Sequence, residues 1–501
     1  MAVTVEALGL LFDPYVLAVI AASAVFGLFV GAMPGLTATM AVALLVPITF
    51  YMEPVPSIAA MVTVSAMAIF AGDIPGALLR IPGTPASAAY TDEAHAMTRR
   101  GQAELALGAA LVCSALGGLV GAVVLTFAAP SLALFALNFS SYEYFWLACL
   151  GLTCAVFVSR GSPVKGLISL LFGLFFATIG LDPVSGVVRF TFGSVELTGG
   201  LGLVPVLIGM FAVAEVIRSV AAVVPPLRID QQPVGNVFRG LAPVLWRYRN
   251  GIARGGAIGT FLGALPGVGA DIAAWISYAL ARRLSREPEK FGTGHVEGVA
   301  SATAANNASL SSAYVPAVVF GIPGDSITAI VIGVLFMKGM TPGPTVFLYQ
   351  PALIYAVFFS FFLANLLLLP LGFGAIRLAK ALLRVPRAVL MPVILLFCIV
   401  GSFAITNTAF SIWVMLAMGV VGYLMEENGI PVAPLVLGIV LGPLIEETFL
   451  TSMMKSDGSF VAFFTRPIAG TVGVVTLLIW AVPVLLWAWR SVSAGRAAAR
   501  A

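Results

Sequence analysis

Two stretches of this chain, residues 27–41 and 259–273, match at eight of fifteen positions and carry polar side chains beside a Pro-Gly pair. Pro removes a backbone donor and Gly permits non-helical dihedrals, so each apolar run is predicted to break at this pair. Inside a membrane, such a break must line a cavity or lie within protein. We therefore expect two facing surfaces for a polar ligand. The candidate ligand-binding residues are Pro34, Gly35, Thr37 and Thr39 in the first copy and Pro266 and Gly267 in the second.

A second pair of motifs follows the breaks, with Ile81-Pro82-Gly83 matching Ile322-Pro323-Gly324. Each motif is predicted to form a re-entrant hairpin, over residues 74–90 and 313–335, with the Pro-Gly pair at its tip. Residue types that cap helices follow both tips, so we expect helices to start there. The candidate binding residues at the tips are Arg80, Pro82, Gly83, Thr84 and Ser87, then Pro323, Gly324, Asp325, Ser326 and Thr328.

Helix starts of this kind favour an anionic ligand. A helix N-terminus carries about half a positive charge together with unpaired N–H groups, so two facing tips form a cradle for carboxylates. Arg80 lies within the first hairpin and is able to pair bidentately with a carboxylate. The alternative is that its side chain extends to the cytoplasmic interface.

A separate group of residues has the chemistry of a cation site. Thr303, Asn306 and Asn307 lie on one apolar segment, and Asp271 follows the second break. Buried amides and a carboxylate are costly in a membrane unless they meet a cation or a partner. Amide oxygens favour Na⁺, whereas H⁺ would need a titratable group, for which Asp271 is the candidate. Hydrogen bonding between helices is the structural alternative.

The composition indicates what kind of structural elements position these residues. Hydrophobic residues make up 60% of the 501 residues and charged residues only 10%, whereas soluble proteins average about 25% charged residues. At about 20 residues per crossing, the chain can supply about 12 or more spans, so we expect an all-α polytopic membrane protein. The net charge of +4 is modest and dispersed, which gives no indication of nucleic-acid binding.

The chain divides into a first transmembrane repeat (1–223), a cytoplasmic linker rich in arginine (224–254) and a second repeat (255–501). The loop 49–57 has no Lys or Arg, whereas its counterpart contains Arg282, Arg283, Arg286 and Lys290. The positive-inside rule therefore predicts that the two repeats have inverted topology. The same rule places the N-terminus in the periplasm and the C-terminus in the cytoplasm.

The motifs resemble those of the large membrane subunit of bacterial tripartite tricarboxylate transporters, over about residues 15 to 485. The resemblance rests on residues 34–39, both Ile-Pro-Gly tips, Ala305-Asn306-Asn307-Ala308 and Met337 to Pro344. It implies an inner-membrane subunit that imports citrate, another tricarboxylate or a related organic acid. It also implies two partners, a small four-span membrane subunit and a periplasmic solute-binding protein that selects the substrate.

Inverted repeats with broken helices are a recurring plan of secondary transporters. The chain lacks the glycine-rich phosphate loop of ATP-driven proteins, so we expect a cation gradient, of Na⁺ or of H⁺, to drive transport without a cofactor. A passive anion channel is the alternative. An intramembrane enzyme is a weaker one, because its candidate residues lack metal-ligand spacing. Those residues are Glu426, Glu427, Glu446, Glu447, His95 and His295.

Overall fold

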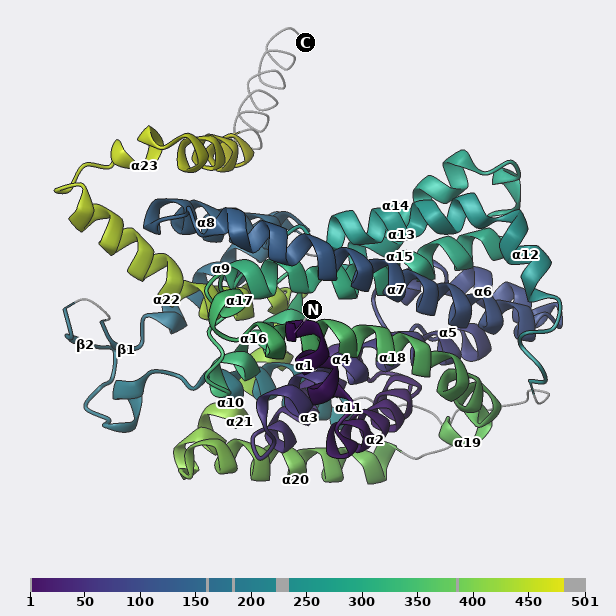
Figure 1. Cartoon of the computed structure of the whole chain (residues 1–501). Helices are drawn as coiled ribbons and strands as arrows, with labels where there is room; N and C mark the ends of the chain where they lie inside the picture. The colour runs from purple at the N-terminus through teal and green to yellow at the C-terminus, as the bar shows by residue number, and fades with distance from the viewer. Residues whose placement is uncertain (1, 159–161, 183–184, 222–233, 384–386, 482–501) are drawn as a thin grey trace, which may run out of the picture.

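The computed structural model describes residues 2–158, 162–182, 185–221, 234–383 and 387–481, almost all of whose regular structure is helical (Figure 1). The helices up to residue 221 are α1 (Ala2–Leu11), α2 (Pro14–Gly31), α3 (Ala38–Thr49), α4 (Pro54–Ala71), α5 (Asp73–Leu79), α6 (Thr91–Arg99), α7 (Ala103–Ala136), α8 (Ser141–Val158), α9 (Pro163–Ala177), α10 (Leu203–Ile208) and α11 (Ala214–Ala221). Short helical turns are η1 (Ser87–Ala89), η2 (Glu196–Gly199) and the π-helical η3 (Gly209–Val213).

The remaining helices follow residue 240. They are α12 (Leu241–Arg247), α13 (Arg249–Gly263), α14 (Gly269–Leu284), α15 (Val296–Phe320), α16 (Ser326–Met337), α17 (Val346–Tyr349), α18 (Pro351–Arg377), α19 (Ala379–Leu382), α20 (Arg387–Thr406), α21 (Ala409–Glu427), α22 (Val432–Lys455) and α23 (Ala462–Thr465), with the turn η4 (Pro288–Lys290). An apolar helix, Pro467–Ala481, ends the described part of the chain.

Eight helices in the described residues are long and apolar enough to cross a bilayer. They comprise α2, α4 with α5, α7, α10 to α11, α18, most of α20, α21 and α22. Four shorter apolar helices accompany them: α3, α9, α16 and Pro467–Ala481. The chain is therefore an all-α polytopic membrane protein, as its composition predicts.

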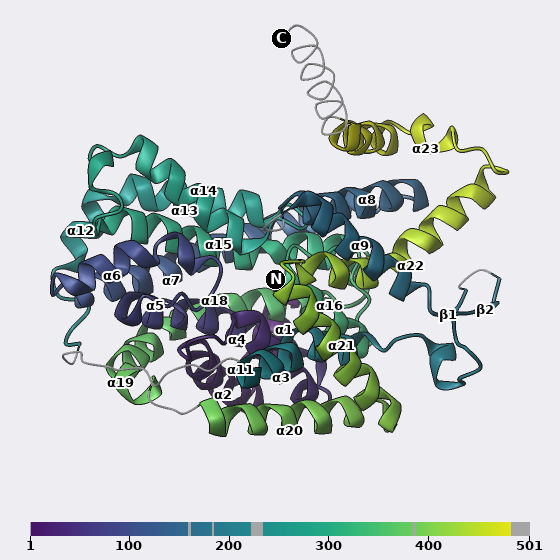
Figure 2. The same ribbon diagram turned by 180° about the vertical axis from the view of Figure 1, so that it is seen from behind.

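A small β-hairpin, which was not predicted from the sequence, interrupts the helices. Strands β1 (Gly180–Leu181) and β2 (Val188–Arg189) pair antiparallel, with Gly180 opposite Arg189. The hairpin projects from the helical body in both views (Figures 1 and 2). It follows α9, which ends at Ala177.

The predicted linker 224–254 is described only from residue 234, and it holds α12 and the first turn and a half of α13. Six further arginines that the positive-inside rule would take into account lie outside the described residues: Arg160, Arg228, Arg384, Arg490, Arg496 and Arg500.

Both predicted helix breaks are confirmed. α2 ends at Gly31 and α3 begins at Ala38, and Thr37 caps the new helix by accepting a hydrogen bond from the Met40 N–H at 3.2 Å. α13 likewise ends at Gly263 and α14 begins at Gly269, here without a side-chain cap. Gly35 and Gly267 adopt φ values of 89° and 77°, a left-handed conformation that favours glycine. The Pro-Gly pairs therefore set both turns.

The first arm of each predicted hairpin differs from the expectation. Residues 313–320 continue α15, and α5 follows α4 directly, so each arm is the end of a long helix. The reason is that Pro75 lies in the first turn of α5, where proline is tolerated, and that α15 accommodates Pro316 in its interior. Both helices end alike: the N–H groups of Ile81 and Ile322 donate to the carbonyls of Pro75 and Pro316, each at 3.3 Å.

After each tip, two residues three positions apart bond to each other: the side chain of each accepts a hydrogen bond from the backbone N–H of the other. Thr84 and Ser87 each accept from the other's N–H, at 3.1 and 3.0 Å. Asp325 and Thr328 do the same at 2.8 and 2.9 Å. Asp325 and Thr328 form a capping box that starts α16, as predicted, whereas Thr84 and Ser87 precede only the short turn η1 before α6.

α15 is the central helix of the fold. Every residue from Val296 to Val319 is buried, and glycines on neighbouring helices bring backbones into contact with it. A Cβ atom added to Gly259 of α13 would lie 2.2 Å from the Ala305 carbonyl oxygen, and one on Gly117 of α7 would lie 2.1 Å from that of Ala304. Small residues thus let three helices pack closely, as is common in membranes.

A buried carboxylate fastens α6 to the loop before α15. Glu93 accepts hydrogen bonds from the Tyr278 hydroxyl at 2.7 Å and from the N–H groups of Gly294 and His295 at 2.6 and 2.8 Å. The Gly292 N–H also donates to it. Elsewhere in this loop, hydrogen bonds from Lys290 and His295 lower the pKa of Glu287 to about 2, so this carboxylate stays ionised at neutral pH.

Two alanine substitutions in α13 test the helix packing. Gly259→Ala should destabilise the protein by about 1–3 kcal/mol, because its methyl group meets the backbone of α15. Gly256→Ala is the matched control, since its Cβ would meet only Val120 at 3.9 Å. It should be neutral or stabilising by up to about 1 kcal/mol. Thermal unfolding in detergent measures both, and equal midpoints would contradict the close contact.

Candidate binding site

The two breaks and the two tips meet at one cavity of about 560 Å³, a size common for small-molecule sites. Segments from both halves of the chain line it. They are residues 37–39, 84–85, 267–272, 325–327 and 429–433, with Ile69, Ala155, Phe211, Arg218, Asn306, Glu426 and Leu437.

Four helix N-termini reach this cavity. The first residues of α3, α14, α16 and α22 all contribute to its lining. Each N-terminus carries about half a positive charge, so together they provide about two positive charges without a basic side chain. Their N–H groups also point outward from the helix ends, which suits a ligand with several acceptor oxygens.

Some of the predicted ligand-binding and ion-binding residues line this cavity. The predicted residues that line it are Thr37, Thr39, Thr84, Gly267, Asp325 and Ser326 for the anion and Asp271 and Asn306 for the cation. The prolines and glycines before them lie in the turns behind the lining. These are Pro34, Gly35, Pro82, Gly83, Pro266, Pro323 and Gly324.

The tip glycines have a packing role. A Cβ on Gly83 would lie 2.3 Å from the Cα of Gly72, and one on Gly324 would lie 2.9 Å from the Cβ of Ala313. The Gly83 N–H also donates to the Gly72 carbonyl at 3.1 Å. Glycine at these positions lets each tip lie against the helix before it, which positions Thr84 and Asp325 at the cavity.

Arg80 lies outside the cavity lining. Its side chain is 65% exposed, and its Nε donates to Asp92 at 2.7 Å. With a φ of 61°, Arg80 occupies the left-handed position that Gly321 fills at the end of α15. This placement matches the interfacial alternative better than a substrate contact.

The buried amides of α15 face different surroundings. Asn306 lines the cavity, and its Nδ2 lies 3.5 Å from the Tyr90 hydroxyl, which donates to Asp73 at 2.6 Å. Asn306 Oδ1 and both amide atoms of Asn307 lack a hydrogen-bond partner among the described residues. Thr303 lies away from the lining and bonds within α15, to the Val299 carbonyl at 2.9 Å.

Arg218, the arginine that lines the cavity, was not predicted from the sequence. Arg218 of α11 donates to Glu215 at 2.6 Å and forms an ion pair with Glu426 at the end of α21. Figure 2 shows these two helices on the same side of the molecule. The charged pair Glu215 and Arg218 within an apolar span could have indicated it, because an ionisable residue in a membrane-spanning segment is a candidate functional residue.

Charged groups of both signs line the cavity. Asp271, Asp325 and Glu426 contribute three formal negative charges and Arg218 one positive charge, a sum of −2. The four helix N-termini oppose this sum, whereas the C-terminus of α21, which also reaches the lining, adds to it. The cavity therefore presents groups of both signs, suited to a ligand anion accompanied by a cation.

The residues considered for an enzyme lie apart. Glu446 binds Arg189 of β2 through two hydrogen bonds, at 2.5 and 3.0 Å. His95 lies 3.1 Å from the Ala77 carbonyl, and His295 lies 3.2 Å from Glu287. Of this group, only Glu426 lines the cavity.

Interrupted helices that meet around one polar cavity within a polytopic membrane protein are the design of a membrane transporter. The comparison with protein families agrees. Residues 17–437 match the model of the tripartite tricarboxylate transporter TctA family, and the chain belongs to that family.

Two similar proteins come from Agrobacterium vitis. An uncharacterized 52.8 kDa protein in the TAR-I ttuC′ 3′ region is 36% identical over 458 residues, which cover 90% of this chain and 89% of that protein. An uncharacterized protein in the TAR-II ttuC′ 3′ region is 37% identical over 228 residues, 45% of this chain and 94% of that protein. No solved structure matches the chain.

Arg218 should be needed for tricarboxylate uptake. We expect Arg218→Gln to raise the half-saturating substrate concentration by about tenfold or more, the worth of a hydrogen bond between charged groups. The matched control is Arg189→Gln, which removes another arginine paired with a glutamate, but outside the cavity. Uptake at matched membrane levels measures both, and equal effects would remove Arg218 from the site.

Proposed function

We propose that this chain is the translocation subunit of a binding-protein-dependent secondary transporter that imports tricarboxylates or related organic acids, driven by a cation gradient. One observation carries the proposal: helix N-termini, hydroxyl groups, an arginine and acidic groups converge on one cavity between the breaks. The chain belongs to a family of tricarboxylate transporters, which supports tricarboxylates as the substrate class.

The anion is held by donors from several segments. The hydroxyl groups of Thr37, Thr39, Thr84 and Ser326 surround the cavity, with the backbone near Gly267. Arg218 supplies the guanidinium that the sequence assigned to Arg80. Since Arg218 already pairs with two glutamates, an incoming carboxylate competes with Glu426 for it.

The charge balance of the cavity favours cation coupling. Each carboxylate of a fully ionised tricarboxylate adds one negative charge to a lining whose formal side-chain charges already sum to −2. Uncompensated charge is costly in a low-dielectric site, so the anion binds best together with cations. A cation gradient then drives uptake of the pair.

The coupling cation is Na⁺ on this proposal, with Asp271 and Asn306 as ligands and Asn307 beside them. Side-chain oxygens and carbonyls of a broken helix are the ligands that such sites use. The unpartnered Asn306 oxygen, which is buried and borders the cavity, supports this assignment. Coupling to H⁺ is the alternative and would use Asp271, or Asp73 through Tyr90.

Orientation and partners complete the proposal. The loop between α14 and α15, with Arg286 and Lys290, lies in the cytoplasm by the positive-inside rule, and the N-terminus lies in the periplasm. The two halves then face opposite ways across the bacterial inner membrane. A small four-span membrane subunit and a periplasmic solute-binding protein assemble with the chain, as the tripartite family name implies.

Reconstitution tests this function. Proteoliposomes that hold both membrane subunits, supplied with binding protein and labelled citrate, should accumulate citrate above its outside concentration when Na⁺ is higher outside. Collapsing the cation gradient should stop accumulation. Flux that only equilibrates citrate would contradict the proposal and indicate a passive channel.

Substitutions at the cation ligands test the coupling. Asp271→Asn and Asn306→Ala should each raise the half-saturating Na⁺ concentration about tenfold or more, because each removes a ligand oxygen or its charge. Thr303→Val is the matched control, since this hydroxyl bonds within α15 away from the cavity. If both Asp271→Asn and Asn306→Ala keep the wild-type Na⁺ dependence, the ion site lies elsewhere.

A further inference from the structure

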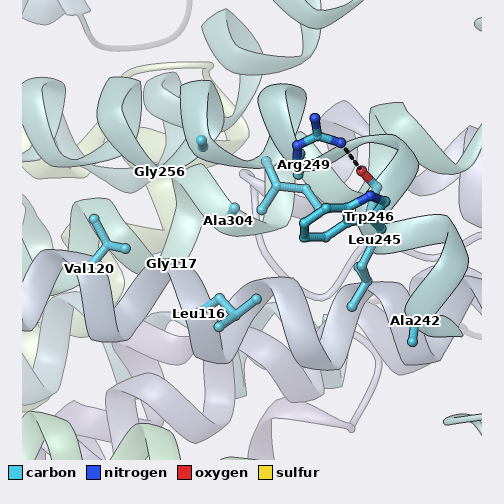
Figure 3. A pocket seen from close by; sticks show the side chains of 11 residues that line it. Leu116, Gly117, Val120, Ala242, Leu245, Trp246, Arg249, Gly256 and Ala304 are labelled. Carbon is cyan, nitrogen blue, oxygen red and sulfur yellow. Dashed lines mark hydrogen bonds between the residues drawn. The ribbon is translucent and has the colours of Figure 1, made fainter.

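A second cavity, of about 480 Å³, lies away from the first, as an apolar groove between α7, α12 and α13 (Figure 3). Its walls are side chains such as Leu116 and Val120 of α7, Leu245 and Trp246 of α12, and Ile252 of α13. Leu116 and Val120 are 45% and 47% exposed, so the groove opens on the outer surface of the helices.

Small residues make the groove hollow. Gly117 and Ala304 bring α7 and α15 into backbone contact, and Ala304 lies at the back of the groove. Gly256 leaves open space on α13, because a Cβ there would meet only Val120, at 3.9 Å. The hollow is therefore a property of the packing and has room for a flexible hydrocarbon chain.

One end of the groove is cationic. Arg249 donates to the Trp246 carbonyl at 3.0 Å, and its guanidinium lies 4.7 Å from the centre of the Trp246 ring (Figure 3). Nearby Arg247 and Arg254 pair with Glu287 and Glu297. For Arg249, no ion pair with a carboxylate is recorded in the described part of the chain.

We propose that this groove binds an anionic phospholipid, with one acyl chain along the apolar walls and the phosphate at Arg249. Charge complementarity selects the headgroup, since a guanidinium without a recorded carboxylate partner is a good phosphate ligand. The indole of Trp246, 71% exposed, has the amphipathic character that favours the headgroup level of a bilayer. Basic pockets between membrane helices commonly hold such lipids.

Lipid binding to the purified, delipidated chain tests the proposal, with phosphatidylglycerol and phosphatidylcholine of the same acyl chains as probes. Native mass spectrometry should show preferential retention of phosphatidylglycerol. Arg249→Gln should weaken phosphatidylglycerol about fivefold, the worth of one basic residue at an anionic surface, and leave phosphatidylcholine unchanged. Gly256→Leu fills the groove and should weaken both lipids.

Matched variants exclude general effects. Arg283→Gln removes an exposed arginine of α14 outside the groove, and Gly374→Leu adds a side chain on α18 where nothing lies within 4 Å. Both should retain lipid like the wild type. Equal retention of the two lipids by the wild type, or unchanged retention by Arg249→Gln and Gly256→Leu, would overturn the proposal. So would a Gly256→Leu variant that keeps its lipid but loses the small membrane subunit, because the groove would then seat a protein helix.

Discussion

A peptide group without a hydrogen-bond partner is costly in hydrocarbon, and this constraint organises the whole structure. Each interrupted helix leaves free N–H groups at its new start. The fold places four helix starts around one polar cavity, and side chains cap two of them, Thr37 at α3 and Asp325 at α16. The rest of the helical surface is then free to be apolar. The same rule explains why the polar cavity lies beside α15, which is buried along almost its whole length.

The local parts of this arrangement could be predicted from the sequence because their causes are local. Proline and glycine act on their own turn, so the breaks at Gly35 and Gly267 and the helix start at Asp325 were predictable. The hairpin arms were not, because a proline in a first turn or within a long helix does not force a new element. The strands β1 and β2, with two residues each, leave no periodic pattern to detect.

The composition of the cavity depends on contacts that no local pattern contains. Arg80 and Arg218 are both arginines within apolar surroundings, yet one reaches solvent beside Asp92 and the other lies at the cavity beside Glu426. The start of α22 joins the lining from more than a hundred residues beyond Asp325. Only the packing of distant helices decides these positions. The mixture of positive and negative groups follows from that packing, and it suits a cavity that binds an anion and a cation together.

The hydrogen bonds at Glu93 make the contact between α6 and the loop before α15 harder to break than the ion pair of Arg218 and Glu426 at the cavity. Moving α6 relative to α14 and the loop before α15 would leave a buried carboxylate without its four donors. On the wall formed by α11 and α21, by contrast, Arg218 and Glu426 are partly exposed, and water can replace their contact. Relative motion of α11 and α21 therefore breaks fewer contacts between elements than relative motion of α6 and the loop before α15.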